Sequence, residues 1–426
     1  MSDFIIENVR LIDASSGLDQ QGALLVRKGL IADVGAGIGR PEGVAVLDGK
    51  GAILCPGLVD MRVELGEPGG EFRETVASAA MAASAGGITT VAALPDSKPA
   101  IDDPALVQLL RARGEATGQI TVLPYGAVTR GCQGEELAEI GLLREAGAVG
   151  FTDGAKAIAS SRTMRLALSY AAGFGARIIQ HAEDPELARG GAATQGELAT
   201  RLGLPSIPAA AEAIMVARDI RLAELTGGAL HFAHISTGEA LALIRAAKAR
   251  GLAITCDTAP PYFDLNETAI GEFRTFAKLS PPLRAEADRR AVVEALADGT
   301  IDAIASDHQP RDADDKRLPF AQAAPGGIGL ATLLGVTLAQ VHGGQLSLMR
   351  AIELLSCGPA KLLDSAAGTL AKGAVADLCL LDLERAWQVN VGSLPGKAQN
   401  SPFDGRALEG RVVGTWKAGR RVYESK

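Results

Sequence analysis

The chain is poor in aromatic residues and contains no long apolar run. Only 4% of its 426 residues are aromatic, although 47% are hydrophobic. No segment approaches the roughly 20 apolar residues of a membrane helix, and the N-terminus has no basic region. We therefore expect a protein that does not enter a membrane. Ala, Leu, Val and Ile supply the apolar content, which is typical of helices packed on a central sheet.

Cysteine is also scarce. The chain has five cysteines, an odd number without CxxC spacing: Cys55, Cys132, Cys256, Cys357 and Cys379. This pattern predicts reduced thiols, several of them buried, in a cytoplasmic protein.

Positive charge is in deficit. The 42 Lys and Arg residues are outnumbered by 50 Asp and Glu residues, which gives a formal net charge of −8. Nucleic-acid binding needs a basic face that neutralises phosphates, so this balance argues against it. The Gly-rich turns match no phosphate-binding loop, so a nucleotide site is not predicted either.

Both ends of the chain have a sequence pattern that is typical of short strands separated by turns. The strand-like runs are residues 4–11, 23–26, 30–34, 373–384 and 409–424. Alternating apolar residues bounded by glycine are typical of hairpins. We expect one small β-sandwich domain built from residues 1–54 and 366–426, with a different domain over residues 55–365.

The central region repeats one unit: an Ala/Leu-rich helix, a glycine, a β-rich run and a polar residue. Asp153, His181, His234 and Asp257 each stand six positions after such a glycine. Glycine suits the left-handed end of a helix, and the following run is long enough to cross a parallel sheet.

These units number eight. Their strands end near Glu64, Asp96, Val128, Asp153, His181, His234, Asp257 and Asp307, and helical stretches such as 73–86, 134–146, 208–226, 237–250 and 286–298 lie between them. Eight β/α units predict a TIM-like (β/α)8 barrel, whose strand ends meet at one face. A doubly wound sheet is the alternative, although it rarely has so many polar strand ends.

Four of the strand-end residues have the chemistry of a metal site. Asp153, His181, His234 and Asp307 would converge at the barrel mouth, and two imidazoles with two carboxylates suit Zn²⁺. Such a site activates water for amide or ester hydrolysis, with a nearby Asp taking the proton. The alternative is that each is an ordinary polar strand terminus.

The remaining histidines are weaker candidates. We expect His231 to face the helix layer or a neighbouring strand, and His308 to point away from Asp307. His342 is expected on the surface.

Several motifs together resemble the amidohydrolase superfamily, and specifically the dihydroorotases that associate with aspartate carbamoyltransferase. The resemblance runs nearly end to end. Its motifs are Pro56-Gly57-Leu58-Val59-Asp60, Glu67-Pro68-Gly69-Gly70, Gly86-Gly87-Ile88-Thr89-Thr90, Gly150-Phe151-Thr152-Asp153-Gly154, Gln180-His181-Ala182-Glu183-Asp184, His234-Ile235-Ser236-Thr237, Ser280-Pro281-Pro282-Leu283-Arg284, Ala305-Ser306-Asp307-His308 and Asn400-Ser401-Pro402-Phe403-Asp404-Gly405.

The chain departs from the family at both the metal site and the substrate site. The family's first-strand His-x-His pair is Arg62 and Glu64 here, and its substrate-carboxylate Arg is Gly66. Three further pocket positions also differ: the second-strand Asn is Asp96, the Asn before Pro-Pro-Leu-Arg is Ser280, and a His near the last strand is Arg311. The resemblance leaves Asp153 as the bridging carboxylate, His181 and His234 as ligands, and Asp307 as the catalytic acid.

Arginine cannot be a metal ligand, because it keeps its proton in proteins. We predict that Arg62 replaces the metal electrostatically and pairs with Asp307, Asp153 or both. Alternation along a strand puts Glu64 on the same face as Arg62, where Glu64 is a candidate substitute ligand.

The preferred hypothesis is a catalytically deficient dihydroorotase homologue of pyrimidine biosynthesis that serves as a structural partner of aspartate carbamoyltransferase. It would bind zinc at reduced occupancy or not at all, and would form a homo-oligomer. The alternative is an active zinc-dependent dihydroorotase with an atypical metal site, which interconverts dihydroorotate and N-carbamoyl-L-aspartate. A third hypothesis is hydrolysis of another cyclic amide, as in hydantoinases or allantoinases.

Overall fold

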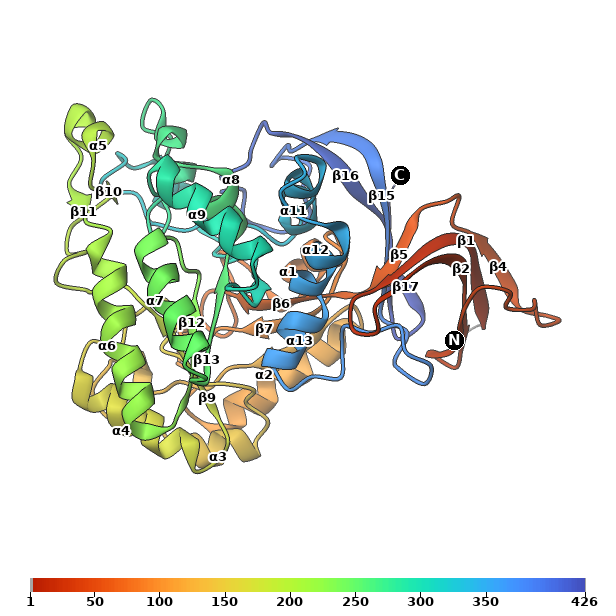
Figure 1. The fold of residues 1–426 in the computed structure, drawn as a ribbon, viewed down its shortest axis with the longest axis horizontal. Coiled ribbons are helices and arrows are strands. Elements are labelled where there is room, and N and C mark those ends of the chain that lie inside the picture. The colour runs from red at the N-terminus through yellow and green to blue at the C-terminus, as the bar shows by residue number, and fades with distance from the viewer. Residues whose placement is uncertain (1–2, 426) are drawn as a thin grey trace.

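A computed structural model describes residues 3–425. Figure 1 shows a helix-covered body of central strands, beside a sheet to which both ends of the chain contribute. The sheet contains the first strands of the chain next to the last ones, and the N- and C-termini both lie on that side.

The terminal sheet has eight strands in the order β17-β16-β15-β5-β1-β2-β3, with β4 paired to β1. Its members are β1 (Phe4–Asp13), β2 (Leu18–Arg27), β3 (Leu30–Gly35), β4 (Ala45–Asp48), β5 (Ile53–Pro56), β15 (Leu378–Gln388), β16 (Ala407–Lys417) and β17 (Arg420–Glu424). Strand β5 joins the two ends, because it runs parallel to β1 and antiparallel to β15. The expectation of a β unit made from both termini is confirmed. The predicted boundary after residue 54 falls inside β5, and the division into two domains stays a prediction.

The buried Asp13 carboxylate links the two ends of the chain through hydrogen bonds. Its carboxylate accepts from the Ser15 amide at 2.8 Å, the Thr369 hydroxyl at 3.0 Å and the Leu370 amide at 2.7 Å. We expect Asp13→Ala to lower the free energy of unfolding by about 3 kcal/mol, because it leaves the buried Leu370 amide and the partly buried Thr369 hydroxyl without this acceptor. Urea denaturation measures this loss. The control is Asp19→Ala, whose exposed ion pair with Arg10 contributes less than about 1 kcal/mol.

The central strands close into a ring. They are β6 (Leu58–Val63), β7 (Ile88–Ala93), β8 (Thr121–Pro124), β9 (Arg177–His181), β12 (Ala229–Ala233), β13 (Ile254–Thr258) and β14 (Ala303–Ile304). Parallel ladders join β6-β7-β8 and β14-β13-β12-β9. Phe151 supplies the fourth strand position by bridging Gly126 and Ile178, and a parallel bridge between Val63 and His308 completes the circle. The predicted (β/α)8 barrel is confirmed, and the alternative prediction of an open doubly wound sheet is wrong.

Helices cover the outside of this barrel. They are α1 (Val76–Ala85), α2 (Pro104–Thr117), α3 (Ile140–Glu145), α4 (Ser161–Ala172), α5 (Glu197–Leu202), α6 (Ala210–Thr226), α7 (Gly238–Ala249), α8 (Pro260–Asp264), α9 (Glu286–Ala297), α10 (Ala313–Arg317), α11 (Leu333–His342), α12 (Leu348–Leu355) and α13 (Cys357–Leu362). A short pair, β10 (Ala193–Thr194) and β11 (Ser206–Ile207), and 3-10 turns at Arg130–Cys132, Glu267–Ile270 and Thr275–Ala277 complete the elements. The predicted helix 134–146 forms only from Ile140, because Leu137 bridges Thr129 instead.

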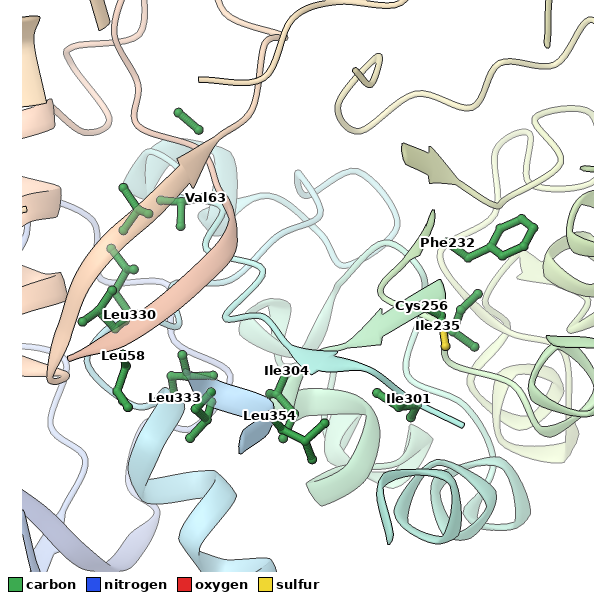
Figure 2. Packing of buried hydrophobic residues seen from close by; sticks show 14 of the residues in the cluster. Leu58, Val63, Phe232, Ile235, Cys256, Ile301, Ile304, Leu330, Leu333 and Leu354 are labelled. Atoms are coloured by element: carbon green, nitrogen blue, oxygen red, sulfur yellow. The ribbon is translucent and has the colours of Figure 1, made fainter. Parts of the chain in front are cut away.

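The main core lies between the strands and the helices. Figure 2 shows Leu58 and Val63 of β6 close to Leu330 and Leu333, and Phe232 of β12 on the opposite side of the picture. All five cysteines are free, and four of them are buried, which confirms the expectation for the thiols. Within residues 3–425, no helix has both the length and the apolar character needed to cross a membrane.

Candidate functional site

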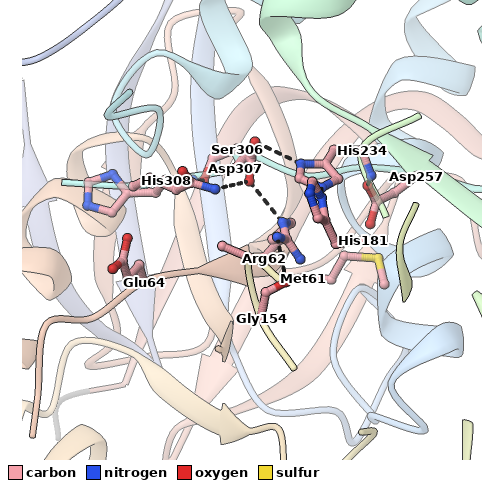
Figure 3. Close-up of polar contacts among 12 residues, drawn as sticks. Met61, Arg62, Glu64, Gly154, His181, His234, Asp257, Ser306, Asp307 and His308 are labelled. Atoms are coloured by element: carbon pink, nitrogen blue, oxygen red, sulfur yellow. Dashed lines mark hydrogen bonds and ion pairs between the residues drawn. The ribbon is translucent and has the colours of Figure 1, made fainter. Parts of the chain in front are cut away.

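The centre of the barrel mouth is a buried ion pair between Arg62 and Asp307. Arg62 lies near the end of β6 and is 1% exposed. Its Nε donates to Oδ1 of Asp307 at 2.9 Å, and its Nη2 donates to the carbonyl of Gly154 at 3.1 Å (Figure 3). The structure therefore pairs Arg62 with Asp307, one of the two partners expected from the sequence.

Asp307 follows β14 and gathers three donors. Besides Arg62, it accepts from Nε2 of Gln309 at 3.1 Å and lies 3.0 Å from Nδ1 of His234. Burial favours the neutral acid, but His234 and Arg62 outweigh it and hold the pKa of Asp307 well below its ordinary value. The carboxyl group is therefore ionised, and the Arg62 guanidinium compensates its charge.

The two candidate histidine ligands contact each other. Nδ1 of His181 lies 2.7 Å from Nε2 of His234. Burial, and then the neighbouring His234 and Arg62, lower the pKa of His181 well below its ordinary value, so its ring is neutral. With Nδ1 of His234 facing Asp307 and Nε2 facing His181, both nitrogens of the His234 ring are engaged.

Backbone strain marks the ends of the two strands that supply this centre. His234 follows β12 with φ at +40°, and Asp307 follows β14 with φ at +50°. Residues other than glycine rarely adopt this left-handed region, and such positions cluster at functional sites. The strained backbone at His234 and at Asp307 brings their side chains into contact with each other.

Asp153 forms no ion pair with Arg62 among the described residues, although Arg62 contacts the neighbouring Gly154. Its Oδ1 accepts from the amides of Val128 and Thr129 at 3.0 and 2.9 Å, and its Oδ2 accepts from the Thr129 hydroxyl. Burial raises the pKa of Asp153 against the effect of these hydrogen bonds. The prediction that Arg62 pairs with Asp307, Asp153 or both is therefore met by Asp307. Segment 128–129 satisfies this carboxylate locally.

The four predicted zinc ligands do not form a ligand set. Across residues 3–425, no group of three His, Cys, Asp or Glu side chains is arranged to hold a metal ion. The donors are engaged elsewhere: His181 with His234, Asp153 with Thr129, and Asp307 with Arg62. A guanidinium next to these groups would also repel a dication. The arrangement does not fit zinc.

Glu64 is not a substitute metal ligand either. Its Oε2 lies 2.5 Å from Nη1 of Arg311, and its Oε1 lies 3.4 Å from Nη1 of Arg73. The expectation that it shares the direction of Arg62 is wrong for two reasons. The pairing of β6 with β7 shifts register between Asp60 and Val63, and β6 ends at Val63, one residue before Glu64. Figure 3 shows Glu64 below His308, apart from the Arg62 guanidinium.

The other predicted pocket positions lie around this centre. Asp96 accepts from the Ala155 amide at 3.0 Å, next to the Gly154 turn that Arg62 contacts. Ser280 lies 3.4 Å from Oε2 of Glu183, and that oxygen lies 3.9 Å from Nε2 of His181. Gly66 has φ at +75°, and a Cβ added there would lie 2.2 Å from the Glu74 carbonyl oxygen.

Sequence reasoning missed a second buried pair beneath this centre. His231 is fully buried, with Nε2 at 2.9 Å from Oδ2 of Asp257 and Nδ1 at 2.9 Å from the Thr255 hydroxyl. It therefore faces its neighbouring strand β13, the second of the two expected directions. Asp257 also accepts from the amide of His234 at 2.6 Å, which fixes the backbone there. The six-residue spacing from glycine could have assigned Asp257 to the site, because it has the same spacing as Asp153 and His181.

The remaining histidines are structural or peripheral. Nε2 of His308 lies 3.6 Å from Oε2 of Glu74, on the side away from His234 (Figure 3). His342 is exposed at the end of α11, as expected.

Comparison with known proteins identifies the family. Residues 51–240 match the family model described as Dihydro-orotase-like. The dihydroorotase of Pelobacter propionicus (strain DSM 2379 / NBRC 103807 / OttBd1) is 45% identical over 421 residues, which cover 99% of each chain. The chain belongs to the dihydroorotase family. The dihydroorotase of Citrifermentans bemidjiense (strain ATCC BAA-1014 / DSM 16622 / JCM 12645 / Bem) is 43% identical over 99% of this chain and 100% of its own.

Solved structures agree with the barrel architecture of this dihydroorotase-family chain. An L-hydantoinase (dihydropyrimidinase) from Arthrobacter aurescens superposes with a TM-score of 0.89 at 26% identity, and the match covers 100% of this chain and 96% of that one. A dihydropyrimidinase from Brevibacillus agri NCHU1002 superposes with a TM-score of 0.85 at 22% identity over 99% and 95% of the two chains. At 22% identity, the similarity to the Brevibacillus agri structure establishes the fold alone.

Proposed function

We propose that this dihydroorotase-family protein is catalytically deficient and acts in pyrimidine biosynthesis as a structural partner of aspartate carbamoyltransferase. The observation that carries the proposal is the buried Arg62–Asp307 pair, with its 2.9 Å separation. In the family resemblance, Arg62 stands where a metal-binding histidine is expected and Asp307 stands where the catalytic acid is expected. A carboxylate that is fixed to a guanidinium with its pKa well lowered is a poor proton acceptor.

The state of Arg62 supports this proposal. Burial alone would lower the pKa of its guanidinium, but the charges of Asp307, Asp257 and Asp96 raise it above the ordinary value. The cation is therefore permanent. It supplies beside Asp307 the positive charge that a metal ion supplies in a hydrolytic site.

The substrate side of the barrel mouth supports the same proposal. In the family resemblance, an arginine at the position of Gly66 binds the substrate carboxylate. Here that position has a left-handed backbone and no room for a Cβ next to Glu74. Arg311, at another pocket position, is engaged by Glu64. Binding of a dihydroorotate carboxylate has therefore lost its expected arginine partner, and the pocket arginine Arg311 is already paired within the protein.

An active dihydroorotase with an atypical metal site is the second candidate. The observation in its favour is that His181, His234 and Asp307 remain buried and connected at the barrel mouth. It requires Arg62 to leave Asp307 and the two histidines to separate before a metal ion can bind. Hydrolysis of another cyclic amide faces the same requirement.

A purified-protein assay decides between these functions. We expect no turnover above about 1 s⁻¹, an ordinary enzyme rate, with dihydroorotate, N-carbamoyl-L-aspartate or a hydantoin as substrate. Elemental analysis of the same sample is expected to give zinc far below one ion per chain. Turnover at an ordinary rate, abolished by a chelator and restored by zinc, would establish the active enzyme and contradict the proposal.

The partner role has its own test. We expect the chain to co-purify with aspartate carbamoyltransferase from the same organism and to form a complex of fixed stoichiometry in size-exclusion chromatography with light scattering. Separate elution of the two proteins at micromolar concentration would contradict the partner role. The same measurement gives the oligomeric state of the isolated chain, predicted to be a homo-oligomer.

The five free thiols support a cytoplasmic location.

A further inference from the structure

A basic cavity lies beside the barrel mouth. Arg311 is the one lining residue that the proposed function also uses. Its volume is about 490 Å³, and it lies between segment 72–73, segment 275–276, α10 and segment 397–400. Of the described residues that line it, one is acidic, Asp312, and five are basic: Arg73, Arg311, Lys316, Arg317 and Lys397. Arg62, His234 and Asp307 are not among the residues that line it.

Lys316 is the buried member of this basic group. Its side chain is 4% exposed, and its Nζ donates to the carbonyls of Thr275 at 3.2 Å and Lys278 at 3.3 Å. Burial, together with the cations Arg311 and Lys278, lowers the pKa of Lys316 to about 7, and Asp315 only partly opposes this. Its hydrogen-bond partners are carbonyls rather than a carboxylate, which leaves its charge uncompensated. A buried cation in that state is costly unless an anion joins it.

The remaining cations of the cavity are only partly neutralised. Arg73 and Arg311 share the single carboxylate of Glu64. The Nε of Arg73 is buried and has no hydrogen-bond partner among the described residues. Lys397 donates to the carbonyl of Glu71 at 2.6 Å, and Arg317 pairs with Asp314 at 3.1 Å. The cavity therefore keeps an excess of positive charge in an otherwise acidic protein.

We propose that this cavity binds a small organic polyanion. Its phosphate or carboxylate groups would lie against Lys316, Arg317 and Lys397, and its apolar body would lie against Phe72 and Phe276. A volume of about 490 Å³ is in the range of small-molecule sites. Phe72 is 65% exposed, and an aromatic surface beside a cation cluster suits a ligand with both a ring and negative charge.

Isothermal titration calorimetry on the full chain tests this site with three probes. They are inorganic pyrophosphate, a benzenedisulfonate and an ethanedisulfonate; the two sulfonates differ by the ring. We expect binding in the sub-millimolar range, tighter for the ring-bearing sulfonate. Charge reversal at the two exposed cations, Arg317→Glu with Lys397→Glu, should weaken binding at least about tenfold, because both lie on the surface of the cavity. The matched control is Arg201→Glu with Lys361→Glu, two exposed cations outside the cavity.

The pH dependence gives a second readout that leaves the buried Lys316 intact. An anion favours its protonated form, so binding should take up protons near pH 7. The affinity for the benzenedisulfonate, whose charge is constant, should fall from about pH 6 to about pH 8.

Absence of binding of all three probes overturns the proposal, as does equal weakening by the control pair. If no probe binds but the Arg317/Lys397 reversal prevents assembly with aspartate carbamoyltransferase, the cavity receives an acidic group of that protein and the proposal is wrong. None of these outcomes depends on whether the chain is catalytically deficient.

Discussion

Replacement of Arg62 by methionine is expected to lower the free energy of unfolding by about 3–5 kcal/mol. Removing one partner of a buried ion pair leaves the other charge uncompensated, and Arg62 is 1% exposed against a 10% exposed Asp307 side chain. The measurement is chemical denaturation of the wild-type chain and the Arg62→Met variant. A loss below about 1 kcal/mol would mean that the pair has no compensating role.

A double-mutant cycle separates charge from packing. The Asp307→Asn change removes the carboxylate charge and keeps its shape. We expect Arg62→Met with Asp307→Asn to be more stable than Arg62→Met alone, because the uncompensated charge is gone. Additive losses from the two changes would contradict an electrostatic role for Arg62.

The pH dependence of stability follows from the same pair. The pKa of Asp307 is lowered on folding, so its stabilising contribution is present above its unfolded value of about 4 and is lost as the pH falls through its folded value. Without Arg62 that pKa rises. The stability difference between the wild type and Arg62→Met should therefore be largest near neutral pH and shrink in acid.

Placing histidines at positions 62 and 64, where the family resemblance expects them, should create a zinc site. Two unit charges about 4 Å apart repel by about 4 kcal/mol in a partly buried site, and a dication is repelled more. Replacing Arg62 and Glu64 by histidine removes this repulsion, frees Asp307 and adds two imidazoles. We expect zinc affinity to rise by at least about 1000-fold, measured by competition with a chromophoric chelator.

Glu64→His alone is the matched control, because it adds one imidazole and keeps Arg62. It should gain little zinc affinity. Equal gains in the single and double variants would show that Arg62 does not oppose the metal. We expect the double variant to remain a poor dihydroorotase, since the Gly66 backbone still excludes an arginine side chain at that position.

Part of the candidate site was predictable because it depends on local pattern. The glycine-to-polar spacing placed Asp153, His181 and His234 at strand ends, and a parallel barrel brings strand ends to one face. A separate argument, that Arg62 replaces the metal ion which the family resemblance implies, paired Arg62 with a strand-end acid. It could not choose between Asp153 and Asp307, because that choice depends on what else reaches each carboxylate.

The sequence by itself determined the barrel and the sheet shared by the two termini. These follow from periodicity and residue identity, which are properties of neighbouring positions. Only the tertiary structure decided which side chains pair with each other at the site. Thr129 satisfies Asp153, Arg311 engages Glu64, and Arg62 reaches Asp307 across 245 positions of sequence. The physical reason is competition between buried charges, which only the folded backbone, with its register shift after Asp60, brings within reach of one another.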